Sequence, residues 1–429
     1  MMKKLIMYKF IAHGLRLCYD FFMSIWVGLG VSTNKDPSTA AKEALEKARL
    51  KIIDRNKVDF ALIFSTVGLS TISLLKTISK NLPDVPLVGC STAAIISSLG
   101  ISLHGVIIIL FSFEEATWNI AHINNMRALT ALASGEELGN RLIYGYMGKY
   151  HRELGILFSD GMNENGSLLL KGLQEKLGLS FPIFGAAASD NFNFLRTYLY
   201  YNNEIFSDGA IGILLGGNLR FGLGVRHGWR PLGRLRKITE HAGNTIKTIE
   251  GKPAAEVYKE YFAKSISELR KDLRFISVFY PIGIYLSGEE EYLLRNIRHI
   301  EDDGSLICQG DIPKDSEIRL MIGTKESCLE ATKEAALEAK ETTLRSMFSP
   351  LEKKELPIKL ALVFDSISRY ILLGKDTQAE LEIIQQEIGE DIPIAGLYTF
   401  GEQTPLKAMD YFGRTHFHNQ TISILTVKG

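Results

Sequence analysis

The segment FPIFGAAASDN, residues 181–191, contains the features that decide the fold. Its first four residues have the composition of a buried strand, and a proline near the start of a strand is tolerated because only one backbone donor is lost. A glycine and three alanines follow, and the segment then reaches Ser189 and Asp190. Residues this small leave room beside the main chain, either for a ligand or for a closely packed neighbour.

This segment belongs to a pattern that occurs three times along the chain. An apolar run that ends in Phe and a small or acidic residue occurs at residues 61–65, 155–160 and 361–365. A stretch of helical periodicity follows each of these runs. A second strand, which contains a proline or begins beside one, then stops at a glycine at residues 85–89, 181–185 and 392–396. A third apolar strand follows at residues 105–111, 209–215 and 421–427.

The order of these segments predicts the sheet topology. A strand, a helix and a strand form a right-handed parallel crossover, and the third strand returns antiparallel to them. Aromatic residues that alternate around Asn202 and Asn203 indicate a hairpin in the second unit. The sequence therefore predicts an α/β fold of mixed sheets with three strand-helix-strand-strand pseudo-repeats. A chance likeness among ordinary α/β crossovers is the alternative, and the matched proline and glycine positions argue against it.

Residues 224–350 do not follow the repeated pattern. They contain hairpin strands at residues 295–322 and an alanine-rich helix at residues 327–347. The arginines around Trp229 form a basic patch. We expect this patch to be the solvated edge of a loop and not a site that binds nucleic acid. This block is therefore predicted to be an inserted hairpin and helix subdomain. The predicted boundaries are an N-terminal extension at residues 1–25, a first domain at residues 26–223 and a second domain at residues 224–429.

The composition limits the classes of function. The 429 residues include 49 basic and 49 acidic side chains, so no net charge favours nucleic acid or an anionic membrane surface. Four widely spaced cysteines without a CxxC motif argue against a disulfide framework and a zinc site, and they fit a reducing cytoplasm. Charges interrupt the apolar N-terminal residues before they reach the length of a signal or a membrane span. Two interpretations of them stay open, an amphipathic helix over residues 4–22 or a true start at Met23.

The three glycine turns form the predicted ligand site. They read GCSTAA, GAAASD and GLYTFGE, and each follows a strand, where open α/β sheets place ligand crevices. The predicted polar contacts are Ser91, Thr92, Ser189, Asp190, Thr399 and Glu402. The glycines predicted to give a ligand access to the main chain are Gly89, Gly185, Gly396 and Gly401. In the alternative, the alanines only let a helix pack tightly on the sheet.

Catalytic and metal-binding motifs are weak. The segment GCSTA has the outline of a nucleophile elbow, but Ala93 stands where the strained turn usually has glycine. A hydrolase that uses Ser91 or Cys90 is therefore kept as the alternative function, although an isolated cysteine after a strand is usually a small buried hydrophobic residue. His416 and His418 share one strand face at a spacing that could hold one metal, but no third ligand is apparent, and half-buried strand histidines beside Phe417 are the favoured alternative.

Two carboxylates occupy equivalent positions in the repeats. Asp160 and Asp365 each end a first strand, so they are expected either to line one crevice or to cap the following helices. We predict no catalytic residue, no metal and no cofactor.

Seven segments, taken in order, resemble the FIST family, a sensory domain built from an N part and a C part. They are residues 30–45, 88–94, 184–192, 227–233, 243–258, 396–403 and 418–421. The resemblance covers nearly everything from Trp26 to Val427. In one place the chain departs from the family, because Ala94 and Ile95 stand where Gly and Glu commonly follow the GCSTA turn. A carboxylate contact is lost there.

The resemblance implies a sensory function. The family is proposed to bind small molecules such as amino acids inside the cell, so the expected ligand is a small polar metabolite and the expected location is the cytoplasm. The FIST-like regions take up the chain, so a signal is expected to pass to a separate output protein. Nucleic acid and stable membrane insertion are not expected. A scaffold that uses its sheet edges for protein contacts is a third class of function.

Overall fold

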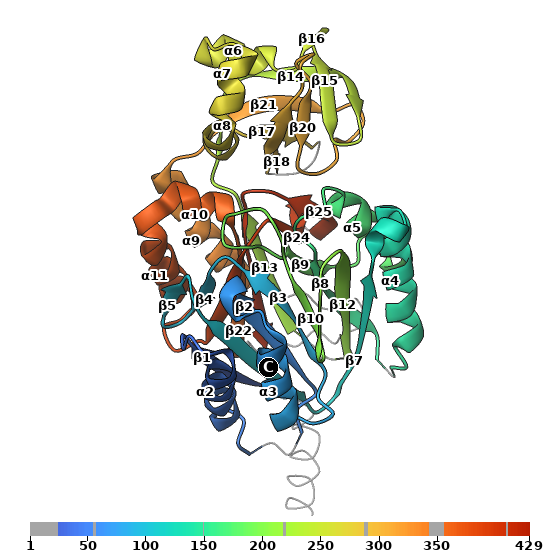
Figure 1. Ribbon diagram of the computed structural model, residues 1–429, viewed down its shortest axis with the longest axis vertical. Helices are drawn as coiled ribbons and strands as arrows, with labels where there is room; N and C mark the ends of the chain where they lie inside the picture. The colour runs from blue at the N-terminus through green and yellow to red at the C-terminus, as the bar shows by residue number, and fades with distance from the viewer. Residues whose placement is uncertain are drawn as a thin grey trace, which may run out of the picture.

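The computed structural model describes residues 25–54, 57–148, 150–217, 220–286, 291–342, 356–408 and 411–429. The N-terminal residues for which an amphipathic helix or a later start was considered lie outside this part of the chain. The described residues form three mixed sheets and one antiparallel sheet with helices packed against them, which confirms the α/β class. Three sheets form a body, and the fourth belongs to a smaller unit at one end of it (Figure 1).

The first sheet has the strand order β1-β6-β2-β3-β10-β11. Its strands are β1 (Ile25–Ser32), β2 (Phe60–Thr66), β3 (Leu87–Thr92), β6 (Val106–Phe113), β10 (Leu199–Tyr201) and β11 (Glu204–Phe206). Its helices are α2 (Pro37–Leu50), α3 (Ile72–Asn81) and the short η1 (Val67–Leu69). Helix α2 begins where Asp36 accepts a hydrogen bond from the amide of Thr39 and where proline occupies the first turn, as helix starts prefer. A Cβ atom on Gly30 would lie 1.8 Å from the carbonyl oxygen of Ala44, so glycine allows α2 to lie directly on β1.

The second sheet has the order β25-β24-β9-β8-β12-β7. Its strands are β7 (Ala116–Asn124), β8 (Arg152–Ser159), β9 (Ile183–Ala187), β12 (Gly209–Gly217), β24 (Gly401–Ala408) and β25 (Tyr411–His418). The associated helices are η2 (Met126–Ala128), α4 (Ala131–Gly145) and α5 (Gly166–Leu177). Glycines again permit close packing, because a Cβ atom on Gly135 of α4 would lie 2.0 Å from the carbonyl oxygen of Leu169 on α5.

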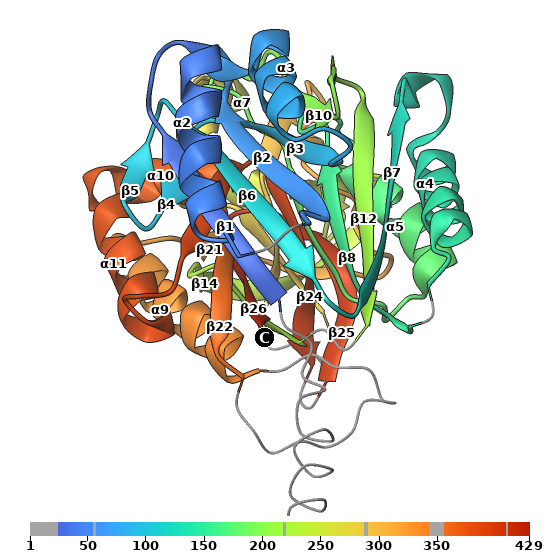
Figure 2. The same ribbon diagram turned by 90° about the horizontal axis from the view of Figure 1, so that it is seen from below.

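The third sheet has the order β13-β26-β22-β23-β4-β5. Its strands are β4 (Ile95–Ser97), β5 (Gly100–Ser102), β13 (Arg220–Arg226), β22 (Ile358–Ser366), β23 (Ile394–Thr399) and β26 (Ile422–Lys428). Its helices are α9 (Lys325–Glu341), α10 (Ile367–Leu373), η3 (Gly374–Asp376) and α11 (Thr377–Ile388). Helices cover the outer faces of all three sheets (Figure 2).

Each of the three sheets of the body contains one parallel pair and a strand that returns antiparallel to it. Strands β2 and β3, β8 and β9, and β22 and β23 are parallel, while β6, β12 and β26 run antiparallel to the first strand of each pair. The phenylalanine near the end of each first strand points to a common centre. The ring centroids of Phe64, Phe158 and Phe364 lie 5.7, 6.0 and 6.1 Å apart, at the spacing of favourable aromatic pairs.

The three sheets exchange hairpins in a cycle. Hairpin β10–β11 pairs with β3 of the first sheet, β24–β25 pairs with β9 of the second, and β4–β5 pairs with β23 of the third. The hairpin expected around Asn202 and Asn203 is present, and Asn202 has the positive φ of 52° that such a turn requires. That hairpin joins the neighbouring unit's sheet, so each sheet is completed by a distant part of the chain.

The fourth sheet forms a separate unit, called here the inserted domain, from residues 230–322. Its strands are β14 (Arg230–Ala242), β15 (Thr245–Ile249), β16 (Lys252–Pro253), β17 (Ile282–Tyr285), β18 (Leu293–Arg295), β19 (Ile297–Ile300), β20 (Leu306–Cys308) and β21 (Glu317–Ile322). Its helices are α6 (Glu256–Phe262), α7 (Ile266–Lys271) and α8 (Leu273–Phe279). They enclose a hydrophobic core of their own.

Two expectations about this region need correction. The alanine-rich helix is α9, and it packs on β13 of the third sheet instead of joining the inserted domain. Glycine permits this close contact, since a Cβ atom on Gly224 of β13 would lie 1.9 Å from the carbonyl oxygen of Ala335 on α9. The basic segment after Trp229 is strand β14, not a loop, and its Arg234 pairs with Glu250.

Candidate functional site

The three predicted glycine turns meet at the centre of the body. The Ser91 hydroxyl donates to the carbonyl oxygen of Ser189 over 2.9 Å. The Ser189 hydroxyl in turn accepts from the amide of Ala93 over 2.9 Å and donates to the carbonyl of Tyr398. The Thr92 hydroxyl also donates to that carbonyl, over 2.9 Å. These side chains are fully buried, and their hydrogen bonds hold the turns to one another.

The glycines of these turns are in contact with neighbouring strands. A Cβ atom would lie 1.8 Å from the carbonyl oxygen of Ile63 at Gly89, and 2.1 Å from that of Val363 at Gly396. At Gly185 it would lie 2.4 Å from the Gln403 amide oxygen, and at Gly401 it would lie 2.4 Å from the ring of Phe417. The expectation that these glycines open the main chain to a ligand is therefore corrected, because protein atoms fill the space beside them.

Asp190 organises the loop that follows its turn. Its carboxylate accepts hydrogen bonds from four consecutive amides, those of Asn193, Phe194, Leu195 and Arg196, over 2.7 to 3.3 Å. A carboxylate with this many backbone donors fixes the local conformation. The loop carries Phe194 to the wall of a cavity described below.

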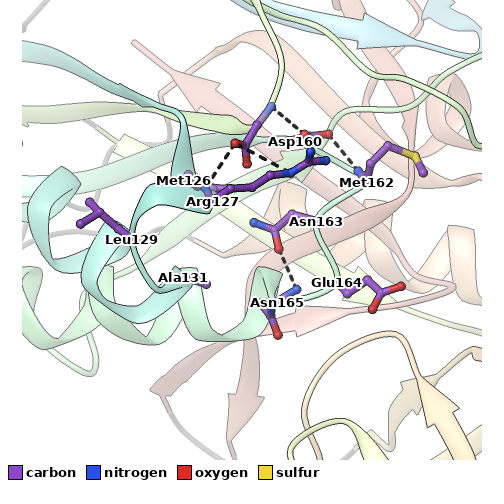
Figure 3. A pocket seen from close by; sticks show the side chains of 10 residues that line it. Met126, Arg127, Leu129, Ala131, Asp160, Met162, Asn163, Glu164 and Asn165 are labelled. Carbon is purple, nitrogen blue, oxygen red and sulfur yellow. Dashed lines mark hydrogen bonds and ion pairs between the residues drawn. The ribbon is translucent and has the colours of Figure 1, made fainter.

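Asp160 lines a pocket of about 280 Å³ at the end of β8 (Figure 3). The residues around it are Met126, Arg127, Leu129, Ala131, Asp160, Met162, Asn163, Glu164, Asn165 and Asp208. Both carboxylate oxygens of Asp160 are engaged, because they accept from the amides of Met162 over 2.9 Å and Asp208 over 2.7 Å and from the hydroxyl of Thr197. Asp365 is not part of this pocket, so the two equivalent acids do not line one crevice.

Asp365 belongs to a buried charge cluster that sequence reasoning did not find. Arg369 on α10 lies one helical turn after it, with the Arg369 Nε atom 2.9 Å from Asp365 Oδ1. The same guanidinium pairs with Glu380 of α11 and donates to the main-chain carbonyls of His227 and Cys328. All three charged side chains are almost completely buried. The signal was present in the sequence as an arginine four residues after an acid that ends a buried strand.

Glu402, one of the predicted contacts, lies beside this cluster and is fully buried. Burial raises the pKa of its carboxyl to about 7, although hydrogen bonds from Thr399 and Thr421 act in the opposite direction. Burial and the nearby Glu380 also raise the pKa of Asp365 well above its usual range. Asp365 and Glu380 thus share one arginine, and burial favours the protonated forms of Asp365 and Glu402.

A Glu402→Gln variant is expected to change how stability depends on pH. The folded-state pKa of about 7 exceeds the ordinary value of 4.5, so the stabilisation from the protonated carboxyl is complete below pH 4.5 and is lost as the pH rises through 7. Relative to the variant, the wild-type protein should lose about 3 kcal/mol of unfolding free energy between pH 4.5 and pH 8. Urea unfolding across this range measures the difference, and parallel profiles would contradict the buried titration. The exposed Glu137→Gln is the matched control.

A second cavity, of about 330 Å³, lies between the inserted domain and the ends of β22 and β23. We call it the interdomain cavity. Its apolar wall consists of Phe194, Leu273, Val278, Ile297, Ile367, Ile371 and Phe400. Its polar wall consists of Arg274, Ser277, Asn296, Arg298, Gln309, Ser366, Ser368 and Thr399. Among the predicted contacts it contains Thr399, whose hydroxyl donates to the buried Glu402.

The loop between β25 and β26 holds the inserted domain over this cavity. The side-chain oxygen of Asn419 accepts a hydrogen bond from the main-chain amide of Asn296 over 3.1 Å. The side-chain amide of Gln420 donates to the main-chain carbonyl of Ser277 over 2.7 Å. Gln309 of the inserted domain donates to the carbonyl of Phe400 on the other side. The cavity is thus built at a domain interface, a preferred place for small-molecule sites.

The candidate nucleophiles and metal ligands are enclosed in the body. Cys90 is fully buried, and burial raises the pKa of its thiol, which disfavours the reactive thiolate. His418 bonds to the carbonyl of Thr404 over 2.8 Å, and burial lowers the pKa of this imidazole to about 3. Within the described ranges, no group of three His, Cys, Asp or Glu side chains is placed to hold a metal ion. No described helix is long and apolar enough to cross a membrane.

Comparison with protein families agrees with this organisation. Residues 59–252 match the FIST N domain, and residues 254–405 match the FIST C domain. The chain therefore belongs to the FIST family, whose domains are sensory domains.

Two further similarities are more distant. An uncharacterized protein of Methanocaldococcus jannaschii is 24% identical over 260 residues, which are 56% of this chain and 49% of that protein. The chain thus spans about half the length of this curated relative. A crystal structure of cyanuric acid hydrolase from A. caulinodans aligns with 94% of this chain and 99% of that one, at 8% identity and a TM-score of 0.35. That likeness is too weak to support an argument.

Proposed function

We propose that this protein senses a small polar metabolite, which binds in the interdomain cavity. The observation that carries the proposal is the position of that cavity at the carboxyl ends of the parallel strands β22 and β23, under the inserted domain. Open α/β sheets place ligands at such strand ends, and the cavity volume of about 330 Å³ falls at the lower end of the range for small-molecule sites. The proposed function is binding without catalysis, because Ser91 and Cys90 are fully buried.

Signal transmission follows from the two bodies that share the cavity. Helix α8 and strand β19 belong to the inserted domain with its own core, whereas Ser366 and Thr399 end strands of the third sheet. A ligand that contacts both stabilises one relative placement of the two bodies. In this proposal a separate output protein in the cytoplasm recognises that placement.

An Ile371→Trp variant is expected to lose ligand-induced stabilisation. Ile371 lies on α10 at the cavity wall, and the larger indole would occupy the space that a ligand needs. In a thermal-shift screen of metabolites, a ligand at one hundred times its dissociation constant should stabilise the wild-type protein by about 2.7 kcal/mol. The same ligand should leave Ile371→Trp unchanged.

The matched control is Ile143→Trp on α4, where the isoleucine is exposed on the outer helix of the second sheet. It should respond to the ligand as the wild type does. Equal stabilisation of Ile371→Trp and the wild type would place the site elsewhere, and a broad screen without any response would overturn the proposed function.

A further inference from the structure

The interdomain cavity has an unusual charge distribution. Arg274 and Arg298 are its two ionisable lining residues, and no Asp or Glu stands among the described residues of its wall. A concave site with charge of one sign attracts ligands of the opposite sign, because low-dielectric walls focus the field.

These two arginines differ from three others of the inserted domain, Arg234, Arg236 and Arg270. Close carboxylate partners are found for Arg234, Arg236 and Arg270, which pair with Glu250, Glu260 and Asp302. No carboxylate of the described residues pairs with Arg274, whose guanidinium lies 6.0 Å from the centre of the Phe194 ring. The carboxylate oxygen nearest to Arg298 belongs to Glu164 and lies 3.9 Å from the Nη2 atom of the arginine. At that distance, and with Glu164 more than half exposed, the interaction is weak.

The remaining wall defines the rest of the ligand. Leu273, Ile297 and Ile367 are apolar and lie among further aliphatic and aromatic residues, so they favour a hydrocarbon portion. The hydroxyls of Ser366 and Ser368 add polar contacts on the body side. A planar carboxylate is suited to the two-pronged hydrogen bonding of a guanidinium, which gives orientation as well as attraction.

We infer that the ligand of the interdomain cavity is a small organic acid: an anionic carboxylate, bound by Arg274 and Arg298, on a compact apolar body. This inference rests on the proposed function, since it names the chemical class of the molecule that the same cavity senses. Phosphate monoesters share the anionic chemistry and are a separate arm of the test.

The experiment uses the full chain and sets of probes with matched apolar bodies. Each set contains a carboxylate such as 3-phenylpropanoate or 4-methylpentanoate, the primary amide of the same acid, and the phosphate monoester of the corresponding alcohol. Calorimetric titration should give carboxylate dissociation constants at least tenfold below those of the amides. Arg274→Gln and Arg298→Gln should each weaken carboxylate binding at least tenfold and leave amide binding unchanged.

The variant Arg230→Gln is the matched control, because Arg230 is an exposed arginine of the inserted domain that lies outside the cavity wall. It should bind carboxylates like the wild type. If the phosphate esters bind more tightly than the carboxylates, the assignment of a carboxylate is overturned and the anionic group of the ligand is a phosphate.

Failure of the inference is distinguishable from failure of the proposed function. If neutral or cationic metabolites bind, and Ile371→Trp blocks them, the cavity is a receptor site but the anionic class is wrong. If carboxylates and amides bind equally well, the arginines do not select the ligand and the inference is overturned. If no compound of any charge binds, both the inference and the proposed function are rejected.

Discussion

Replacement of Arg369 by methionine is expected to lower the unfolding free energy by about 3–5 kcal/mol. The guanidinium is completely buried between Asp365 and Glu380, and it also satisfies the carbonyls of His227 and Cys328. Without it, two carboxylates remain in the protein interior with no cation beside them. The loss should grow as the pH rises, because protonation at low pH removes the buried negative charges.

Denaturant unfolding followed by tryptophan fluorescence measures this loss at several pH values. Arg230→Met is the control, because its ion pair with Glu330 is exposed and should contribute no more than about 1 kcal/mol. If Arg369→Met were as mild as the control at every pH, the buried cluster would not stabilise the third sheet.

A Gly89→Ala variant should be destabilised by about 3 kcal/mol or more. The added methyl group would lie 1.8 Å from the carbonyl oxygen of Ile63, an atom of the paired strand that cannot move alone. Relief would require β2 and β3 to separate at the junction where Ser91 contacts Ser189.

The control for this change is Gly68→Ala in η1. The φ angle of Gly68 does not lie in the left-handed region, so alanine can adopt the same backbone conformation. The nearest atom would lie 4.0 Å from the new methyl group. The substitution should be neutral or stabilising by up to about 1 kcal/mol, since alanine reduces the entropy of the unfolded chain. Similar melting temperatures for the two variants would show that close packing is not the reason for glycine in the turns.

Much of the body was predictable because its signals are local. The Phe at the end of each first strand, the proline and the terminal glycine recur at matched positions, and the glycines occupy equivalent registers. Gly89 pairs with Ile63, Gly185 with Leu157 and Gly396 with Val363. The exchange of hairpins was not predictable, since a segment such as β10 carries no local mark of the sheet that it joins.

The interdomain cavity was beyond sequence reasoning for a related reason. Its wall combines Phe194, Leu273, Gln309 and Ser366 from segments far apart in the chain, and only the docking of the inserted domain brings them together. Thr399 was found because it follows a strand in a glycine turn. Arg274 and Arg298 gave no signal, because nothing in the sequence distinguishes them from the many arginines that lie at a protein surface.

A co-crystal structure with the tightest compound from the metabolite screen would show whether the interdomain cavity is the ligand site. Ligand density is expected between Thr399 and helix α8, with an anionic group against Arg298. Density at the Ser91–Ser189 junction or in the pocket beside Asp160, with the interdomain cavity free of ligand, would contradict it.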